Sequence, residues 1–273
     1  MNCMEPLRAT VTTLAAVYAK KAAGEKIVAL TAYDYLVASL LAECAVDFLL
    51  VGDSLANVVA GHATTLPVTM DEMVYHTRLV VRGAGALPVV ADMPFLSYEV
   101  DVKDAVLNAG RLVKEAGAAG VKVEGALEVL PAVERMVAIG IPVLGHVGLK
   151  PQSVLRLGGH KVQGRTESSA ARIRREALAL QEAGVFAIVL ECVPRALAAA
   201  LTAELAVPTI GIGAGPGCDG QILVTHELLG WFDKPKKFAK PYAALRQVSR
   251  EAVQRFCSDV RAGAFPDAEH SFD

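Results

Sequence analysis

The sequence predicts an α/β protein folded as a single-domain (β/α)8 TIM barrel. Strand-like and helix-like patterns alternate along nearly the whole chain of 273 residues. Alternation with short links is typical of parallel strands joined by right-handed crossovers. A barrel of this kind takes about 250 residues, so one barrel accounts for the chain. An open, doubly wound sheet is the structural alternative.

The strands are predicted from short apolar runs bounded by turn residues, a pattern typical of buried parallel strands. They are expected near 27–31, 46–52, 88–92, 120–124, 141–146, 187–191, 208–212 and 221–225. Eight such runs are the number that closes a TIM barrel, which favours closure over the open sheet.

Helices are predicted between most of these strands. Thr69 and Glu72 have the spacing of a capping box, which begins a helix running to about Arg82. Gly140 and Gly184 stand where the C-terminus of a helix favours a left-handed residue. The other crossover helices are expected over about 102–116, 127–139, 167–183 and 195–205.

Both ends of the chain are expected to belong to the same domain, residues 1–273. The pattern of 10–23 predicts a helix that plugs one end of the barrel. The pattern of 242–262 predicts a charged amphipathic helix, and the residues after it are expected to form an irregular tail.

Composition narrows the classes of function. The net charge is −2, so nothing indicates a nucleic-acid surface. The apolar fraction is 53%, yet no apolar run reaches the ~18 residues of a spanning helix, so subunit contacts in a homo-oligomer explain it better than a membrane does. The N-terminal residues lack a basic stretch followed by an apolar one, and a cytoplasmic location is expected.

Ionisable residues end five of the predicted strands. In a TIM barrel the C-terminal ends of the strands meet at one mouth, where active sites lie. Carboxylates crowded together require a compensating cation, and Mg²⁺ is the first candidate because it prefers oxygen ligands. For Asp53 or Asp92 taken alone, capping of a turn is an equally good interpretation. The residues at the strand ends are Asp53, Asp92, Glu124, His146 and Glu191.

Three of the barrel residues have alternative interpretations. Lys122 and Glu124 are two apart on one strand and therefore share a face, either as a structural ion pair or with Lys122 holding a substrate carboxylate. Lys122 is also a candidate Schiff-base lysine. Glu191 lies among apolar residues and suits either a general base or a buried carboxyl group hydrogen-bonded to the backbone. His146 stands between glycines and is an additional candidate, catalytic or structural.

A glycine-rich segment over 211–220 contains a G-x-G-x-x-G match at 215–220. We reject a dinucleotide site, because the match contains Pro216, precedes no evident helix and lacks the acid expected about 20 residues later. The segment is interpreted as a loop over the barrel mouth.

Ordered motifs along the chain carry a family resemblance. Val51-Gly52-Asp53-Ser54-Leu55, Ala91-Asp92-Met93-Pro94-Phe95 and Val121-Lys122-Val123-Glu124-Gly125 are among them. Gly145-His146-Val147-Gly148-Leu149, with Pro151-Gln152, and Val189-Leu190-Glu191-Cys192-Val193-Pro194 follow in order. Together they resemble the ketopantoate hydroxymethyltransferase family (3-methyl-2-oxobutanoate hydroxymethyltransferases), from about Lys26 to the tail at Pro266.

The resemblance implies a (β/α)8 barrel enzyme that transfers a hydroxymethyl group from 5,10-methylenetetrahydrofolate to 3-methyl-2-oxobutanoate. The product is 2-dehydropantoate (ketopantoate), in pantothenate and coenzyme A biosynthesis, and the route is a Mg²⁺-stabilised enolate. It also implies a homodecamer. By motif position Asp53, Asp92 and Glu124 match the metal site, Asp53, Ser54, Asp92 and Lys122 match substrate-binding positions, and Glu191 matches the general base.

Three alternatives stay open on sequence. A metal-dependent enolate enzyme of the isocitrate lyase and phosphoenolpyruvate mutase type uses similar acids, although no Lys-Lys-Cys-Gly-His loop is present. A class I aldolase would use Lys122 as a Schiff base. An inactive metabolite-binding paralogue is the alternative outside enzymes, and the intact set of acids, lysine and base speaks against it.

Overall fold

The computed structural model describes residues 13–157, 159 and 161–272, and it confirms the barrel. The parallel strands pair in chain order, and β8 closes on β1, which excludes the open sheet. The strands are β1 (Ile27–Thr31), β2 (Phe48–Val51), β3 (Val89–Asp92), β4 (Gly120–Glu124), β5 (Val143–Gly148), β6 (Ala187–Glu191), β7 (Thr209–Ile212) and β8 (Gly220–Leu223).

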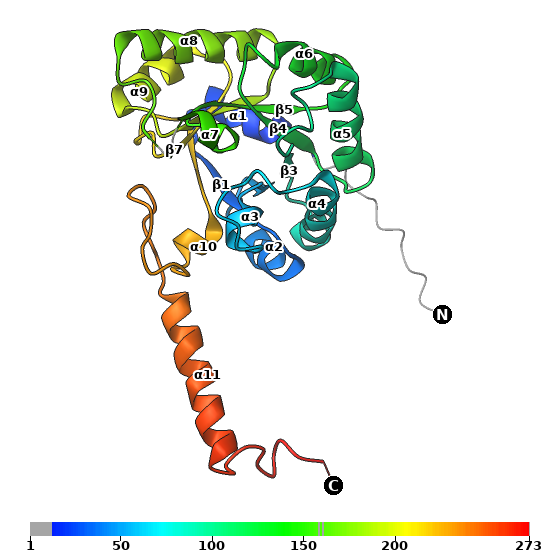
Figure 1. Cartoon of the computed structure of the whole chain (residues 1–273), viewed down its shortest axis with the longest axis vertical. Helices are drawn as coiled ribbons and strands as arrows, with labels where there is room; N and C mark the ends of the chain where they lie inside the picture. Colours follow the sequence, from blue (N-terminus) through cyan, green and yellow to red (C-terminus); the bar gives the residue numbers. More distant parts are fainter. Residues whose placement is uncertain (1–12, 158, 160, 273) are drawn as a thin grey trace. The chain divides into compact units, whose positions relative to one another are not determined.

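Helices surround the strands (Figure 1). Thr69 and Glu72 form both bonds of the predicted capping box at the start of α4, and Asp101 caps α5. The helices up to β8 are α1 (Ala15–Ala23), α2 (Tyr35–Ala42), α3 (Leu55–Val58), α4 (Met70–Ala84), α5 (Val102–Lys114), α6 (Leu130–Ala138), the 3-10 helix η1 (Pro151–Ser153), α7 (Val154–Leu157), α8 (Glu167–Glu182) and α9 (Arg195–Glu204).

The chain divides into two compact units, Met1–Leu223 and Val224–Asp273. The first contains the whole barrel. The second contains α10 (Thr225–Leu228) and the long helix α11 (Leu245–Arg261), which lies within the helix predicted over 242–262. A single domain over residues 1–273 stays a prediction. Among the described residues, no helix is both long enough and apolar enough to cross a membrane.

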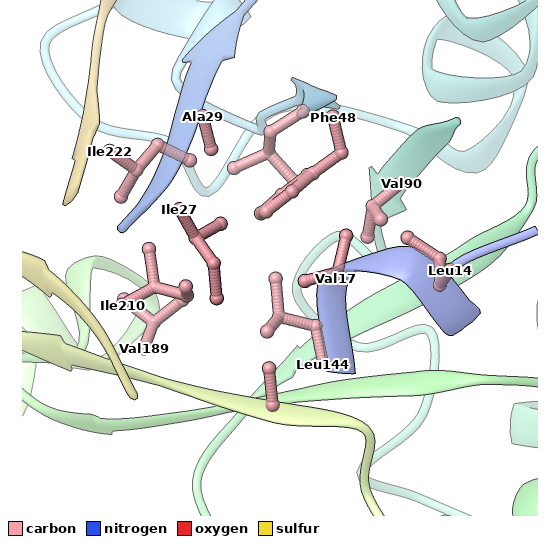
Figure 2. Close-up of a cluster of buried hydrophobic side chains, with 12 residues drawn as sticks. Leu14, Val17, Ile27, Ala29, Phe48, Val90, Leu144, Val189, Ile210 and Ile222 are labelled. Carbon is pink, nitrogen blue, oxygen red and sulfur yellow. The ribbon is translucent and has the colours of Figure 1, made fainter. Parts of the chain in front are cut away.

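The interior of the barrel near the N-terminal ends of the strands is filled by apolar side chains (Figure 2). They include Phe48, Leu144 and Ile210 from three different strands. Leu14 and Val17 from the segment around α1 pack into the same cluster. This confirms the predicted plug for the residues that the structure describes; residues 10–12 of that prediction lie outside them.

The predicted ends of β5 and α6 shift, and the short helices α2, α3, η1, α7 and α10 were not predicted. Strand β5 continues to Gly148, where it still pairs with Glu191 of β6. Helix α6 starts only at Leu130, because a turn closed by the bond from Val129 N to Ala126 O precedes it. Helix α2 was missed because its sequence is a short, nearly continuous apolar run, and such runs do not distinguish a helix from a strand.

The interpretation of the glycine-rich segment after β7 as a loop over the barrel mouth is wrong. The segment connects β7 to the parallel strand β8 and therefore has to run from one end of the barrel to the other, where the other connections use a helix. A Cβ on Gly215 would lie 2.6 Å from the Cβ of Arg195, and one on Gly217 would lie 2.8 Å from that of Ala199, so this backbone passes tightly along α9. Strand β8 follows it directly, so the G-x-G-x-x-G match runs into a strand and not into the helix that a dinucleotide-binding turn opens.

Candidate active site

The side-chain alternation along three strands places ionisable groups inside the barrel above the apolar cluster. Side chains two residues apart on a strand share a face. Val90, Leu144 and Val189 belong to the interior cluster, and therefore the positions two residues later also face inward. Those positions are Asp92, His146 and Glu191.

Lys122 lies at the centre of this group. Its Nζ is 2.8 Å from Asp92 Oδ1 and 3.8 Å from Glu124 Oε1, and its side chain is only 6% exposed. The strand register brings them together, because Asp92 of β3 pairs directly with Lys122 of β4. Burial acts to lower the pKa of Lys122, but the carboxylates of Asp92 and Glu124 outweigh it and raise that pKa. The lysine is therefore held as a cation.

Asp53 and Asp92 meet where the ends of β2 and β3 lie side by side. The backbone N–H of Asp53 donates to Asp92 Oδ2 at 3.0 Å. Burial, together with the charges of Asp92 and Glu124, raises the pKa of Asp53 to about 8. Burial also raises the pKa of Asp92, although Lys122 opposes that shift. This pair of buried carboxylates is thus short of positive charge.

His146 connects the carboxylate of Glu124 to that of Glu191. Its Nδ1 is 3.6 Å from Glu124 Oε1, and its Nε2 is 3.3 Å from Glu191 Oε2. Burial acts to lower the pKa of His146, but contacts with Glu124 and Glu191 outweigh it and raise that pKa to about 9. Burial likewise acts to raise the pKa of Glu124, but His146 and Lys122 outweigh it and lower that pKa. The side chain of Glu191 keeps 15% of its surface exposed, so it is open to a reactant.

Ser54 completes the predicted set at the start of α3. Its Oγ is 2.8 Å from the hydroxyl of the buried Tyr33. A Cβ on Gly52 would lie 2.6 Å from that same Oγ, which is why the residue before Asp53 has no side chain. All seven sequence-predicted site residues therefore lie in one region, linked by the contacts that run from Ser54 and Asp53 to Glu191.

Two residues in this region were missed as site residues. Gln152, in the 3-10 helix η1 after β5, donates from Nε2 to Asp53 Oδ2 and to the Met93 carbonyl, both at 3.0 Å. Its backbone N–H donates to Glu124 Oε2 at 3.0 Å. The hydroxyl of the buried Tyr98 lies 2.8 Å from Gln152 Oε1. The sequence signals were the position of Gln152 just beyond a strand end and its place in the Pro151-Gln152 motif, and neither indicates contact with two acids.

The carboxylates that the structure describes at the barrel mouth are ligands of the kind that a hard cation such as Mg²⁺ prefers, but three of them do not lie close enough together to bind one ion. Within the described parts of the chain, no three or more His, Cys, Asp or Glu side chains are grouped closely enough to hold a metal ion by themselves. Asp53 and Asp92 are linked by the bond from the backbone N–H of Asp53 to the Asp92 carboxylate, which makes their carboxylates the candidate direct ligands. A cation bound there needs further oxygen ligands from water or a reactant, as is usual for Mg²⁺.

The chain is similar to named bacterial enzymes over almost its whole length. It is 56% identical over 261 residues to a 3-methyl-2-oxobutanoate hydroxymethyltransferase of Moorella thermoacetica, covering 95% of this chain and 97% of that one. A relative with the same name from Syntrophus aciditrophicus is 54% identical over 95% of this chain and 96% of its own length.

Solved structures with a similar fold are more distant in sequence. A phosphonopyruvate hydrolase superposes with a TM-score of 0.64 at 15% identity, covering 96% of this chain and 92% of that one. A 2,3-dimethylmalate lyase of the PEP mutase/isocitrate lyase superfamily superposes with a TM-score of 0.59 at 19% identity, covering 96% and 93%. At this level of identity they support the fold alone. The family profile described as ketopantoate hydroxymethyltransferase matches residues 10–268, and the chain therefore belongs to this family of transferases.

Proposed function

We propose that this enzyme transfers a hydroxymethyl group from 5,10-methylenetetrahydrofolate to 3-methyl-2-oxobutanoate, forming 2-dehydropantoate in pantothenate biosynthesis. The observation that carries the proposal is the 56% identity, over 95% of the chain, to a relative named for the reaction with this 2-oxo acid. The ionisable cluster at the barrel mouth supports it, because that cluster supplies an anion-binding lysine, paired carboxylates and a base in one place.

The residues present fit Mg²⁺ as the cofactor. The carboxylates of the cluster outnumber its cationic groups by two when every group is ionised, with protonated His146 counted as a cation. A divalent cation would balance that excess. Asp53 and Asp92 would hold it directly, and Glu124 would act through water, because Mg²⁺ usually takes one or two carboxylates and keeps several waters. The cluster consists of Asp53, Asp92, Lys122, Glu124, His146 and Glu191.

Substrate binding is assigned to residues at the C-terminal ends of the strands β2, β3 and β4. Lys122 and Ser54 orient the carboxylate end of the 2-oxo acid, which is a positioning role. Asp53 and Asp92 contribute through the cation they hold. When bound, Mg²⁺ supplies positive charge against the negative charge that develops on the keto oxygen as the C3 proton leaves.

Glu191 is assigned as the general base that takes the C3 proton of the 2-oxo acid. Its carboxylate is partly exposed at the barrel mouth and is held by His146 at 3.3 Å. His146 in turn contacts Glu124, so it orients the base from inside the barrel. Water adds to the methylene carbon of the folate, and its C–N bonds break to release that carbon as formaldehyde and leave tetrahydrofolate. The carbon nucleophile formed on the substrate attacks the formaldehyde carbon, and protonation of the resulting alkoxide gives the hydroxymethyl group.

A direct assay tests the proposal. The enzyme should form ketopantoate from 3-methyl-2-oxobutanoate and 5,10-methylenetetrahydrofolate, EDTA should abolish this activity, and Mg²⁺ should restore it. Full activity in EDTA, together with trapping of the substrate on Lys122 by borohydride, would establish a Schiff-base aldolase instead. The proposal also includes a cytoplasmic location and a homodecameric assembly.

A further inference from the structure

Gln152 makes contact with two of the proposed metal-site acids at once. Its side chain binds Asp53 at the end of β2, and its backbone binds Glu124 at the end of β4. The third contact, to the carbonyl of Met93, ties it to the residue directly after Asp92. The residue is buried. A single residue from the loop after β5 thus joins the ends of β2 and β3 through its side chain and the end of β4 through its backbone.

The orientation of the Gln152 amide follows from its partners. Asp53 Oδ2 and the Met93 carbonyl are both acceptors, so they require the Nε2 end, which has two N–H donors. Oε1 is then left to face the Tyr98 hydroxyl. That hydroxyl donates to Oε1 at 2.8 Å, which fixes the amide in this orientation. The backbone N–H of Glu124 donates to the same hydroxyl at 3.0 Å.

We propose that Gln152, held in place by Tyr98, is a positioning residue that sets the orientation of the Asp53 and Glu124 carboxylates for a divalent cation. The inference rests on the proposed function, because it concerns the same metal site. A neutral side chain is required here, since a carboxylate at this position would face Asp53 with a like charge. Each acid has one oxygen engaged by Gln152, which restricts rotation of its carboxylate.

The alternative is that the Tyr98–Gln152 pair only stabilises the fold. Removal of a buried hydrogen-bonding group lowers stability in either case. The two roles differ in what happens to the folded protein. A purely structural residue leaves the affinity for a divalent cation unchanged, whereas loss of an outer-shell partner typically lowers metal affinity by about 10- to 100-fold.

Mn²⁺ is a suitable probe, because it takes carboxylate ligands like those of Mg²⁺ and its EPR signal separates free from bound ion. Gln152→Met keeps the length of the side chain and removes its polar atoms. We expect about 10- to 100-fold weaker Mn²⁺ binding and a broadened spectrum of the bound ion. Tyr98→Phe removes only the hydroxyl and should cause a smaller loss in the same direction. Circular dichroism establishes that each variant is folded.

Gln247→Met is the matched control, because Gln247 is exposed on α11 and its side-chain amide donates to Glu251 of the same helix. It should bind Mn²⁺ as the wild type does. Asp92→Asn should lose binding. If Tyr98→Phe or a folded Gln152→Met binds Mn²⁺ with wild-type affinity and spectrum while Asp92→Asn does not, Gln152 is structural and the proposed function stands. If the wild type itself binds no Mn²⁺, the metal site is wrong and this inference falls with it.

Discussion

At the scale of single residues, the barrel mouth holds its charged groups in fixed pairs. Lys122 lies against Asp92, and His146 lies between Glu124 and Glu191. Buried charges are tolerated only when paired, so each of these groups depends on its neighbour. Glu191 is the member with the most exposed side chain among those in the ion pairs of the mouth, which suits a group that exchanges a proton with a substrate.

The variant Glu191→Gln tests whether Glu191 acts as the base and not as a metal ligand. The amide keeps the shape and the neighbour His146 but cannot accept the C3 proton, and loss of a positioned base typically costs ~10²–10⁴ in rate. NMR of the C3 hydrogen of 3-methyl-2-oxobutanoate in D₂O, without folate, measures this step alone. We expect exchange to fall by that factor while binding of Mg²⁺ and the 2-oxo acid stays nearly unchanged.

The control for this experiment is Glu182→Gln, the same chemical change at the exposed last residue of α8. It should exchange at the wild-type rate. Wild-type exchange in Glu191→Gln would remove Glu191 from the role of base and make His146 the next residue to test.

At the scale of elements, the junction between β5 and β6 has no space for a side chain. Gly148 has a φ of +99°, and a Cβ there would lie 2.3 Å from the carbonyl oxygen of Glu191. The same carbonyl accepts from Leu149 N at 2.8 Å, which holds the loop after β5 against the end of β6. The backbone position of the proposed base therefore depends on this glycine.

Gly148→Ala should lower both stability and activity. The left-handed backbone strain alone costs about 1–3 kcal/mol, and the clash displaces Glu191. Gly110→Ala is the matched change, since Gly110 lies inside α5 with nothing within 4 Å of its Cβ position. That change should stabilise by up to about 1 kcal/mol, because alanine favours a helix more than glycine does. Urea unfolding at one protein concentration compares them; equal midpoints for the two variants would contradict the argument.

At the scale of the whole molecule, apolar surface is left uncovered in a single chain. Helix α11 has no buried residue, and Val248, Val253, Phe256 and Val260 on it are exposed. Exposed large apolar side chains also occur on other elements, including Leu36 on α2. Apolar patches of this kind usually mark contacts between proteins.

We therefore predict an oligomer much heavier than the 28.7 kDa of one chain. Burial of exposed apolar groups at subunit contacts drives such association. Ten chains of 28.7 kDa give about 287 kDa, which is the species expected in sedimentation at micromolar concentration. A stable monomer under these conditions would contradict the prediction and leave the 53% apolar content of the sequence without an explanation.

Much of the fold and site was predictable because it depends on local patterns. The strands are short apolar runs, and their inward positions follow from an alternation of two residues. Lys122 and Glu124, for example, share a face for this reason alone. Once the strands are parallel and closed, their C-terminal ends lie at one mouth, so residues such as Asp92 and Glu191 stand at the same end of the barrel although about a hundred residues separate them.

Other features were decided only by tertiary packing. The sequence by itself determined which acids stand at strand ends, but not that Lys122 lies closer to Asp92 than to Glu124, because that choice depends on the register between β3 and β4. It did not indicate the contacts of Gln152 either, since these depend on how the loop after β5 folds back over the mouth. Hydrogen bonds between distant segments form only after the backbone has brought their donors and acceptors within about 3 Å, and no local pattern specifies that approach.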